Sequence, residues 1–435
     1  MTTSAPPLAP ALTRRARAGV LVAAFLAWLF AGLEISLFVL VHRQMTLDLL
    51  GPDTPEAVVT RWFAWYQAAF LFGAAAGGWV FGALGDRAGR TRAMAASVLC
   101  YSLVTLACHE CSSAEAMLVL RFVACLGVGG VWPNAVALVA EAWPDASRPL
   151  TAGLLGAAAN VGFVLLGVIG YYVPITQDSW RWVFLVGASP ALLGVVILFL
   201  VPESPRWLAT RGVQAARALV AEVLRPPLLS RTALGVLLGA IPVVGSAANA
   251  NWLVPWSDAV QHTATAAAVG GPAAAKPPAD PRTKAKTQIT RSGGAVFGSL
   301  LGGLVAGAVG RRLSYFLISL GACAASSVIF TQLDPLHPQF QLAAFVLGFV
   351  GITYFGWLPL FLPELFPTRV RATGAGVSFN TGRVVAGVVV LSAGFLLDRF
   401  GGDYARVGFW TGMIYAAGML VVWLVPRDAT GRLED

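Results

Sequence analysis

The sequence predicts an all-helical membrane protein in which twelve helices cross the bilayer as two related bundles of six. Hydrophobic residues make up 57% of the 435-residue chain and charged residues only 12%. A soluble domain of this length needs far more charge to cover its surface. The apolar residues occur in runs of about 18–25 residues, the length that a helix needs to cross a hydrocarbon core of roughly 30 Å. Two sequence patterns also occur twice, once in each half of the chain.

The apolar runs place the twelve spans to within a few residues. We expect them at 19–41, 62–84, 93–110, 115–140, 150–173, 182–201, 232–254, 292–310, 314–332, 341–363, 372–397 and 407–425. The 47 Gly residues permit close approach of helices within a membrane. The 14 Trp residues fit aromatic belts at the two membrane interfaces.

The polar stretches between the spans define the predicted organisation. It comprises a tail (1–18), a six-helix bundle (19–205), a linker (206–231), a second six-helix bundle (232–426) that carries an insert at 257–290, and a tail (427–435). Within the linker, 213–224 has the pattern of a short surface helix. The insert is rich in Ala and Pro and holds every Lys of the chain, so we expect it to be disordered.

The net charge of +9 at pH 7 reflects membrane topology rather than a nucleic-acid partner. Most of the 30 Lys and Arg residues fall in the tails and in the loops on one side of the membrane. Positive charge stays on the cytoplasmic side, which predicts cytoplasmic termini in a multi-pass protein of the plasma (inner) membrane. The first apolar run follows Arg14, Arg15 and Arg17 but has no clear cleavage site, so it is interpreted as a retained helix.

No metal, cofactor or enzymatic centre is predicted. Cys108 and Cys111 form a lone CxxC pair at the end of the third span, whereas a metal site normally requires a second pair of ligands. The chain has no phosphate-binding loop and no nucleophile–base set.

The repeated patterns relate the two halves. The stretch from Gly77 to Arg87 matches that from Gly302 to Arg312. The pattern Glu-x-aromatic-Pro-x-x-x-Arg-x-x-x-x-Gly begins at both Glu141 and Glu364, at nearly the same separation along the chain. Each copy holds six helices, so both copies have the same orientation in the membrane.

Two motifs resemble those of known families of membrane transporters. The run from Gly82 to Arg92 resembles the signature loop of the major facilitator superfamily, and Pro202–Leu208 resembles the motif that ends the first half of sugar porters. The resemblance implies the major facilitator fold and alternating access to a substrate site near the midplane. It also implies an inner-gate charge network of Asp86, Arg87, Arg90, Glu141, Arg148, Glu203, Arg206, Glu364 and Arg371. Alternatively, Glu203 only caps the linker helix.

The fourth span resembles that of the aromatic acid/proton symporters. Its Arg121-Phe122 pair, its glycines and its Pro133-Asn134-Ala135 run match that family's pattern, with Cys125 in place of a Gly. Gly32-Leu33-Glu34 and Gly382-Arg383 match two further family motifs, although Ala31 stands where the family has an acid.

Three ionisable residues lie deep in the predicted spans: Glu34, Arg121 and Arg383. A charge at mid-membrane costs at least about 2.5 kcal/mol, so each is a functional candidate. We predict that Glu34 and Arg121 couple transport to protons and that Arg383 binds a substrate carboxylate through its planar guanidinium. The alternative for each is structural pairing.

Further polar and aromatic residues are candidates for lining the substrate cavity, with packing as the alternative for the aromatic ones. They are Asn134, Asn160, Asn249, Asn251, Trp252, Tyr354, Trp357 and Asn380. The predicted function is proton-coupled symport of a small organic anion, aromatic or sugar-like, by a monomer with protons and the lipid bilayer as partners. A sugar or polyol carrier is the alternative within transport, and a non-transporting membrane sensor is the alternative from another class.

Overall fold

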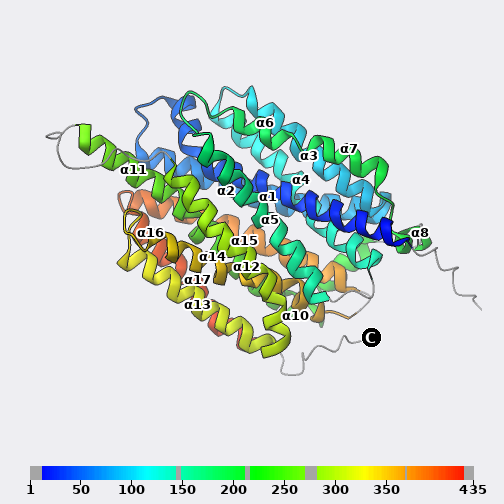
Figure 1. Ribbon diagram of the computed structural model, residues 1–435. Helices are drawn as coiled ribbons and strands as arrows, with labels where there is room; N and C mark the ends of the chain where they lie inside the picture. Colours follow the sequence, from blue (N-terminus) through cyan, green and yellow to red (C-terminus); the bar gives the residue numbers. More distant parts are fainter. Residues whose placement is uncertain (1–11, 144–147, 211–215, 270–281, 368–369, 426–435) are drawn as a thin grey trace, which may run out of the picture.

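The computed structural model describes residues 12–143, 148–210, 216–269, 282–367 and 370–425 (Figure 1). Within these ranges, twelve helical segments are long and apolar enough to cross a membrane, which confirms the predicted number. In the N-terminal half they are α1 (Arg14–Leu50), α2 (Glu56–Ala88), α3 (Arg90–His109), α4 (Ala114–Ala142), α5 (Arg148–Tyr172) and the pair α6 (Trp182–Ala188) and α7 (Ala191–Leu200).

The C-terminal half repeats this organisation. Its spans are α10 (Leu228–Val244) continued by α11 (Leu253–Val269), then α12 (Thr283–Val309), α13 (Arg311–Gln332), α14 (Phe340–Glu364), α15 (Arg371–Arg399) and the pair α16 (Tyr404–Gly412) and α17 (Ile414–Val421). The first and last described residues, Leu12 and Val425, lie at one end of the bundle, here called the terminal end (Figure 1). The other end, with loops 51–55 and 110–113, is the opposite end.

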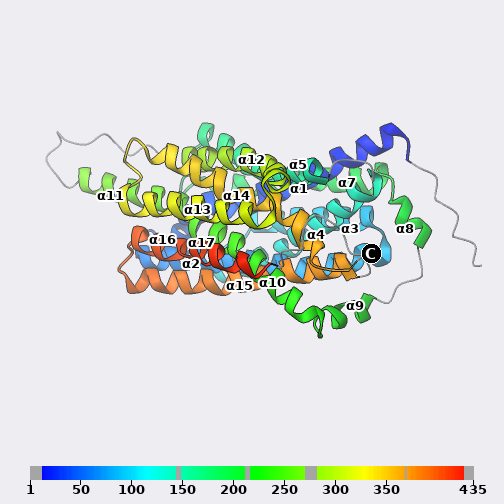
Figure 2. The same cartoon turned by 90° about the horizontal axis from the view of Figure 1, so that it is seen from below.

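The two halves lie side by side and meet along two long helix pairs. α5 packs against α12, and α2 packs against α15 (Figure 1). The short helices α8 (Pro205–Thr210) and α9 (Ala216–Val223) lie at the terminal end, where α8 contacts α4 and α9 lies beside the start of α10 (Figure 2). α9 falls within the surface helix predicted at 213–224.

The seventh span is broken near its middle. A π-helical turn, Gly245–Asn249, and a 3-10 turn, Ala250–Trp252, separate α10 from α11. Pro242 lies one turn before the break and has no N–H to donate, so the regular hydrogen-bond ladder is already interrupted there. The break redirects the Asn249 and Trp252 side chains.

Glycines in the second and fourth spans allow α2 and α4 to touch along their backbones. A Cβ atom at Gly77 of α2 would lie 1.9 Å from the carbonyl oxygen of Leu126 in α4, and one at Gly129 would lie 2.0 Å from that of Ala74. No side chain fits at such distances. The glycine-rich motif of the fourth span therefore has a packing role between α2 and α4.

Two neighbouring glycines in α12 provide a direct test of this packing rule. A Cβ atom at Gly294 would lie 2.1 Å from the carbonyl oxygen of Phe345 in α14, whereas one at Gly293 would meet nothing within 4 Å. We expect Gly294→Ala to lower stability by about 1–3 kcal/mol through overpacking. Gly293→Ala should leave stability unchanged or raise it slightly. Thermal unfolding of both variants in detergent measures the difference, and equal melting temperatures would contradict it.

The predicted disorder of 257–290 is wrong for both ends of that segment. α11 continues to Val269 and α12 begins at Thr283, while 270–281 lies outside the described residues. The Ala-rich composition that was interpreted as disorder also has high helix propensity. Asp258 and Lys284 are buried there and lie 3.9 Å apart, which explains how charged residues of the insert join the helical core.

Candidate functional site

Glu34 of α1 and Arg121 of α4 form an ion pair inside the N-terminal half. Arg121 Nη1 lies 3.1 Å from Glu34 Oε1, and neither side chain is more than 1% exposed. The two groups come from helices α1 and α4, which pack against each other. The structure thus brings together the two residues that the sequence predicts for proton coupling, and that role itself stays a prediction.

The guanidinium of Arg121 is held by more than the carboxylate. Its Nη1 and Nη2 donate to the carbonyl oxygens of Glu34 and Ile35, each at 3.2 Å, and its Cζ lies 4.2 Å from the centre of the Phe38 ring. Glu34 Oε2 has no hydrogen-bond partner among the described residues. Arg121 can therefore stay anchored to α1 if the carboxylate of Glu34 changes its charge.

Arg383 of α15 links the two halves. Its Nη1 donates to the carbonyl oxygen of Ala74 in α2 and to Asn380 Oδ1, both at 3.2 Å, and its Cζ lies 4.7 Å from the centre of the Phe379 ring. No acidic residue pairs with it among the described residues. The hydrogen bonds to Ala74 and Asn380 both use Nη1, which leaves Nε and Nη2 as the remaining donors of the guanidinium.

Most of the other predicted cavity residues hold helices together. Asn134 donates to the carbonyl oxygens of Phe81 and Gly130, and Trp357 donates to that of Arg311 near the terminal end. Tyr354 shares a 2.7 Å hydrogen bond with Ser319, while Asn160 makes a 3.4 Å bond to the Gly156 carbonyl one turn before it in α5. For Asn134, Trp357 and Tyr354 these bonds support packing.

The broken seventh span uses its polar residues in the same way. Asn249 donates to the carbonyl oxygen of Gly408 at 2.7 Å and accepts from Ser326 at 3.1 Å, which fixes the π-helical turn against α16 and α13. Asn251 is buried beside it. Trp252 points to the other half, where its ring meets Phe63 of α2 edge-on at 5.3 Å.

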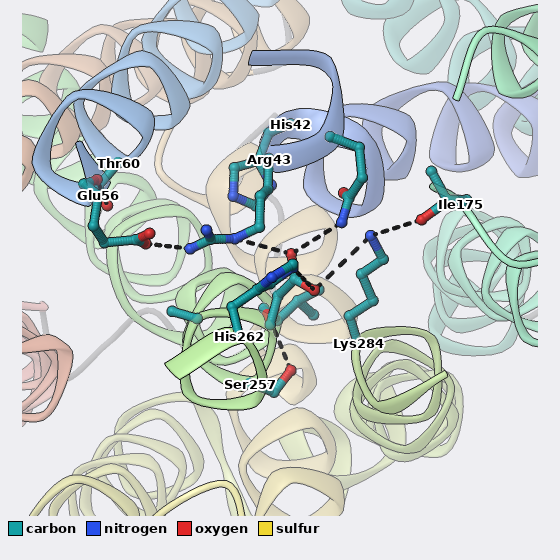
Figure 3. Close-up of polar contacts among 12 residues, drawn as sticks. His42, Arg43, Glu56, Thr60, Ile175, Ser257, His262 and Lys284 are labelled. Atoms are coloured by element: carbon teal, nitrogen blue, oxygen red, sulfur yellow. Dashed lines mark hydrogen bonds and ion pairs between the residues drawn. The ribbon is translucent and has the colours of Figure 1, made fainter. Parts of the chain in front are cut away.

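A cluster of four charged side chains joins the halves at the opposite end (Figure 3). Arg43 of α1 pairs with Glu56 of α2 and, across the halves, with Asp258 of α11, whose Oδ2 lies 3.2 Å from Arg43 Nε. Lys284 of α12 lies 3.9 Å from Asp258 Oδ1 and reaches back to the carbonyl oxygen of Ile175, 3.5 Å away in the N-terminal half. Arg43, Glu56, Asp258 and Lys284 are called the opposite-end latch below.

Neutral side chains extend the opposite-end latch. Tyr404 of α16 bonds to Thr60 of α2 at 2.9 Å and donates to Glu56 at 3.2 Å. Gln44 lies 3.5 Å from Asp258, and His262 lies 3.9 Å from it. The opposite end is therefore closed by polar contacts between the halves. None of these residues was predicted as functional.

Asp258 contacts both cations of the opposite-end latch, Arg43 and Lys284. We therefore expect Asp258→Asn to weaken the latch. We expect the balance between closed and open arrangements of this end to shift at least about tenfold toward the open one, because charge-assisted hydrogen bonds are worth roughly 1.5–3 kcal/mol. Spin labels at Asp53 and Pro338, exposed in the two halves, report the shift as longer electron paramagnetic resonance distances.

Labelling uses a background in which the five free cysteines are replaced. Glu110→Gln is the control, since Glu110 is an exposed acid at the same end that pairs only locally, with His109. An unchanged distance distribution in Asp258→Asn would contradict the role of the latch.

The charges predicted for the inner gate gather at the terminal end, but they pair within a half. Arg90 lies 2.6 Å from Asp86 and 3.9 Å from Glu141, while Arg311 pairs with Glu364 at 2.7 Å. Arg311 occupies the place of Asp86 in the repeat. These described ion pairs link α2 to α3 and α4 in one half and α13 to α14 in the other, and the gating role of the charge network stays a prediction.

The structure describes the side chains of only some of the remaining members of the charge network. Glu203 accepts from the backbone N–H of Thr91 at 3.1 Å, in the first turn of α3, and from that of Ser204 at 2.9 Å, directly before α8. Arg371 donates to the carbonyl oxygen of Phe366, and Arg87 is exposed. The side chains of Arg148 and Arg206 lie outside the described residues.

Sequence reasoning missed two further buried polar residues. Arg291 of α12 is 2% exposed, and it lay between the predicted insert, which ended at residue 290, and the predicted span, which began at residue 292. Gln67 of α2 is fully buried, and neither of its amide atoms has a partner among the described residues. A charged residue two positions before the Gly293-Gly294 pair was the available signal for Arg291. For metals, the described part of the chain contains no group of three His, Cys, Asp or Glu side chains that could hold an ion.

The chain is similar to several bacterial transporters along most of its length. It is 27% identical to the cis,cis-muconate transport protein of Acinetobacter baylyi, over 93% of this chain and 92% of that protein. It is also 27% identical to the probable 4-methylmuconolactone transporter of Cupriavidus pinatubonensis, over 83% and 81%. A 4-hydroxybenzoate transporter of Pseudomonas aeruginosa, PcaK, is 36% identical over 34% of each chain.

Solved structures show the same fold. The proton:xylose symporter XylE bound to 6-bromo-6-deoxy-D-glucose aligns with a TM-score of 0.70 at 16% identity, over 97% of this chain and 98% of that chain. The partially occluded inward open conformation of the E. coli xylose transporter XylE aligns with a TM-score of 0.71 at 17% identity, over 96% and 100%. The predicted major facilitator fold is confirmed.

A family profile matches both halves of the chain. The profile of the family described as sugar (and other) transporter covers residues 21–241 and 287–427. The interruption between the two matched ranges, residues 242–286, corresponds to the end of α10, the irregular turns at 245–252, all of α11, the segment 270–281 and the start of α12. With its twelve membrane-spanning helices, this chain belongs to the sugar (and other) transporter family of the major facilitator superfamily.

Proposed function

We propose that this transporter carries a small organic anion, in particular an aromatic or related unsaturated acid, together with a proton by alternating access. The observation that carries the proposal is the Glu34–Arg121 ion pair, sealed inside the N-terminal half with one carboxylate oxygen unpartnered. An acid buried in a membrane helix is costly and is a functional group by default.

Glu34 accounts for proton coupling in this mechanism. Protonation of the Glu34 carboxylate removes its charge and weakens its contact with Arg121. Arg121 remains bonded to the carbonyl oxygens of Glu34 and Ile35, so the helix pair does not come apart. The ion pair can therefore be made and broken once per cycle, which is what coupling to a proton requires.

Arg383 accounts for recognition of the anion. Its Nη1 is anchored on Ala74 and Asn380, and its other donors can meet a carboxylate in the bidentate geometry that guanidinium favours. Because the anchor Ala74 belongs to the N-terminal half, occupation of Arg383 would be sensed by both halves. The names of the relatives, which specify muconate, methylmuconolactone and hydroxybenzoate, support an acid as cargo.

The terminal end is the cytoplasmic end in this proposal. The positive-inside bias of the loops places both termini in the cytoplasm of the cell. The opposite-end latch then closes the outer side, while the described ion pairs at the terminal end stay within each half. The arrangement corresponds to the outward-closed phase of the cycle.

A sugar or polyol carrier is the second candidate. The Pro202–Leu208 motif and the fold shared with a xylose symporter favour it. A neutral sugar has no carboxylate for a buried cation, so this candidate leaves Arg383 without a role in recognition.

Uptake into proteoliposomes distinguishes the candidates. The purified protein is given labelled 4-hydroxybenzoate, cis,cis-muconate, xylose and glucose, with and without a proton gradient directed inward. We expect an acid to accumulate only with the gradient, and its uptake to acidify the vesicle interior. Accumulation of a sugar instead would favour the second candidate. Absence of uptake of every compound would favour the sensor.

A further inference from the structure

Arg291 is a buried cation for which the proposed mechanism has no role so far. It lies in α12 and is 2% exposed. Its one hydrogen bond among the described residues runs from Nη2 to Ser292 Oγ at 3.3 Å, and its Nε has no acceptor. A guanidinium has five donors, so most of its hydrogen-bonding capacity has no acceptor among the described residues.

The other buried arginines are satisfied in a different way. Arg43 has two carboxylate partners, Arg121 has one, and Arg383 has two oxygen acceptors from different residues. Arg291 has no acidic partner among the described residues. Leaving a buried charge without a partner is costly, which indicates that a partner arrives from outside the chain.

The position of Arg291 places it where the two halves meet. Lys284, Gln288 and Arg291 are spaced at i, i+4 and i+7, so they share one face of α12. Gln288 donates to the carbonyl oxygen of Phe163 in α5 at 3.0 Å, and the Arg291 Cζ lies 5.5 Å from the centre of the Phe163 ring. Gln288 Oε1, like Arg291 Nε, has no partner among the described residues.

An aromatic ring lies beside this position. The Phe163 ring of α5 is the one that the described contacts place against the guanidinium of Arg291. A ring beside a guanidinium suits a flat acid, whose carboxylate meets the cation while its conjugated body packs on the ring.

We propose that Arg291 and the face of α12 around it form a second binding station for the carboxylate of a planar organic acid. This inference rests on the proposed function and adds a site to it. Arg291 is eight residues, about 12 Å, from the end of α12 at the opposite end, and two turns beyond Lys284 of the opposite-end latch. Arg383 is 16 residues, about 24 Å, from the corresponding end of α15.

The two cations therefore act in sequence. An acid that passes the open latch meets Arg291 first and then reaches Arg383 nearer the middle of the membrane. The stations also lie on different contacts between the halves, since Arg291 faces α5 and Arg383 contacts α2.

The test compares an acid with its neutral amide on purified full-length protein. Calorimetric titration with 4-hydroxybenzoate and 4-hydroxybenzamide measures the preference for the charged form in the wild type, in Arg291→Lys and in Arg291→Met. Arg291→Lys keeps the buried charge and so protects the fold. Lys286→Met is the matched control, because Lys286 is an exposed cation of the same helix.

We expect Arg291→Lys and Arg291→Met each to weaken binding of the acid at least tenfold while weak binding of the amide is unchanged, and Lys286→Met to match the wild type. Wild-type affinity for the acid in either folded Arg291 variant would overturn this station and leave the proposed function standing. If the wild-type protein binds neither 4-hydroxybenzoate nor cis,cis-muconate, the proposed function fails and the station falls with it.

Discussion

Glu34→Gln is expected to abolish accumulation of substrate against a gradient while sparing exchange of substrate across the membrane. The amide has nearly the shape of the carboxylate and can still accept a hydrogen bond from Arg121, so the α1–α4 contact survives. It cannot take up or release a proton, so substrate movement loses its driving force. Uptake into proteoliposomes with an imposed proton gradient should fall at least about tenfold, to the level of passive equilibration.

A loss of proton coupling in Glu34→Gln must be distinguished from a folding defect. Counterflow, in which preloaded unlabelled substrate drives entry of labelled substrate without a proton gradient, should continue in Glu34→Gln. Glu115→Gln serves as the control, because Glu115 is an exposed acid in the first turn of α4, the helix that carries Arg121. Proton-driven accumulation at the wild-type level in Glu34→Gln would rule out the coupling role.

The fold and the Glu34–Arg121 pair were accessible from the sequence for physical reasons. Membrane spans are predictable because the bilayer imposes one length and one polarity on every helix. A lone acid and a lone base deep in two such helices have few ways to avoid an uncompensated charge, and pairing with each other is one of them. The contact at 3.1 Å follows that expectation.

The opposite-end latch was not accessible in the same way. Arg43 and Asp258 lie in different halves of the chain, and only packing of the halves brings them to 3.2 Å. Asp258 and Lys284 also fall in a segment whose composition resembles a flexible insert, and composition carries no information on contacts made at a distance. Arg291 was missed for a related reason, since a span boundary placed one residue too late removed it from the list of buried charges.

The asparagines illustrate a further limit. Asn249 and Asn134 lie in membrane helices, where a polar amide is either a ligand or a support for a bent or closely packed backbone. The sequence offers no means of choosing between these roles. In the structure both amides bond to backbone carbonyl oxygens of neighbouring helices, to Gly408 and Phe81 respectively.

Arg383→Lys is expected to weaken binding of the anion about ten- to hundredfold although the charge is kept. Lysine can still reach a single oxygen such as that of Ala74, but it has no planar pair of donors left for a carboxylate. The loss of a charge-assisted hydrogen bond is worth roughly 1.5–3 kcal/mol, which corresponds to that range of affinity. Arg383→Ala should bind at least as weakly, because the buried site then lacks the charge altogether.

Calorimetric titration of the folded variants with the transported acid decides the role of Arg383. Arg399→Lys is the matched control, since Arg399 is an exposed arginine in the last turn of the same helix and has no access to the interface of the halves. Wild-type affinity in both Arg383 variants would remove Arg383 from the binding site and leave its contact with Ala74 as a structural link. A cation that recognises nothing is expected of a carrier for neutral cargo, so that outcome would favour the sugar or polyol carrier.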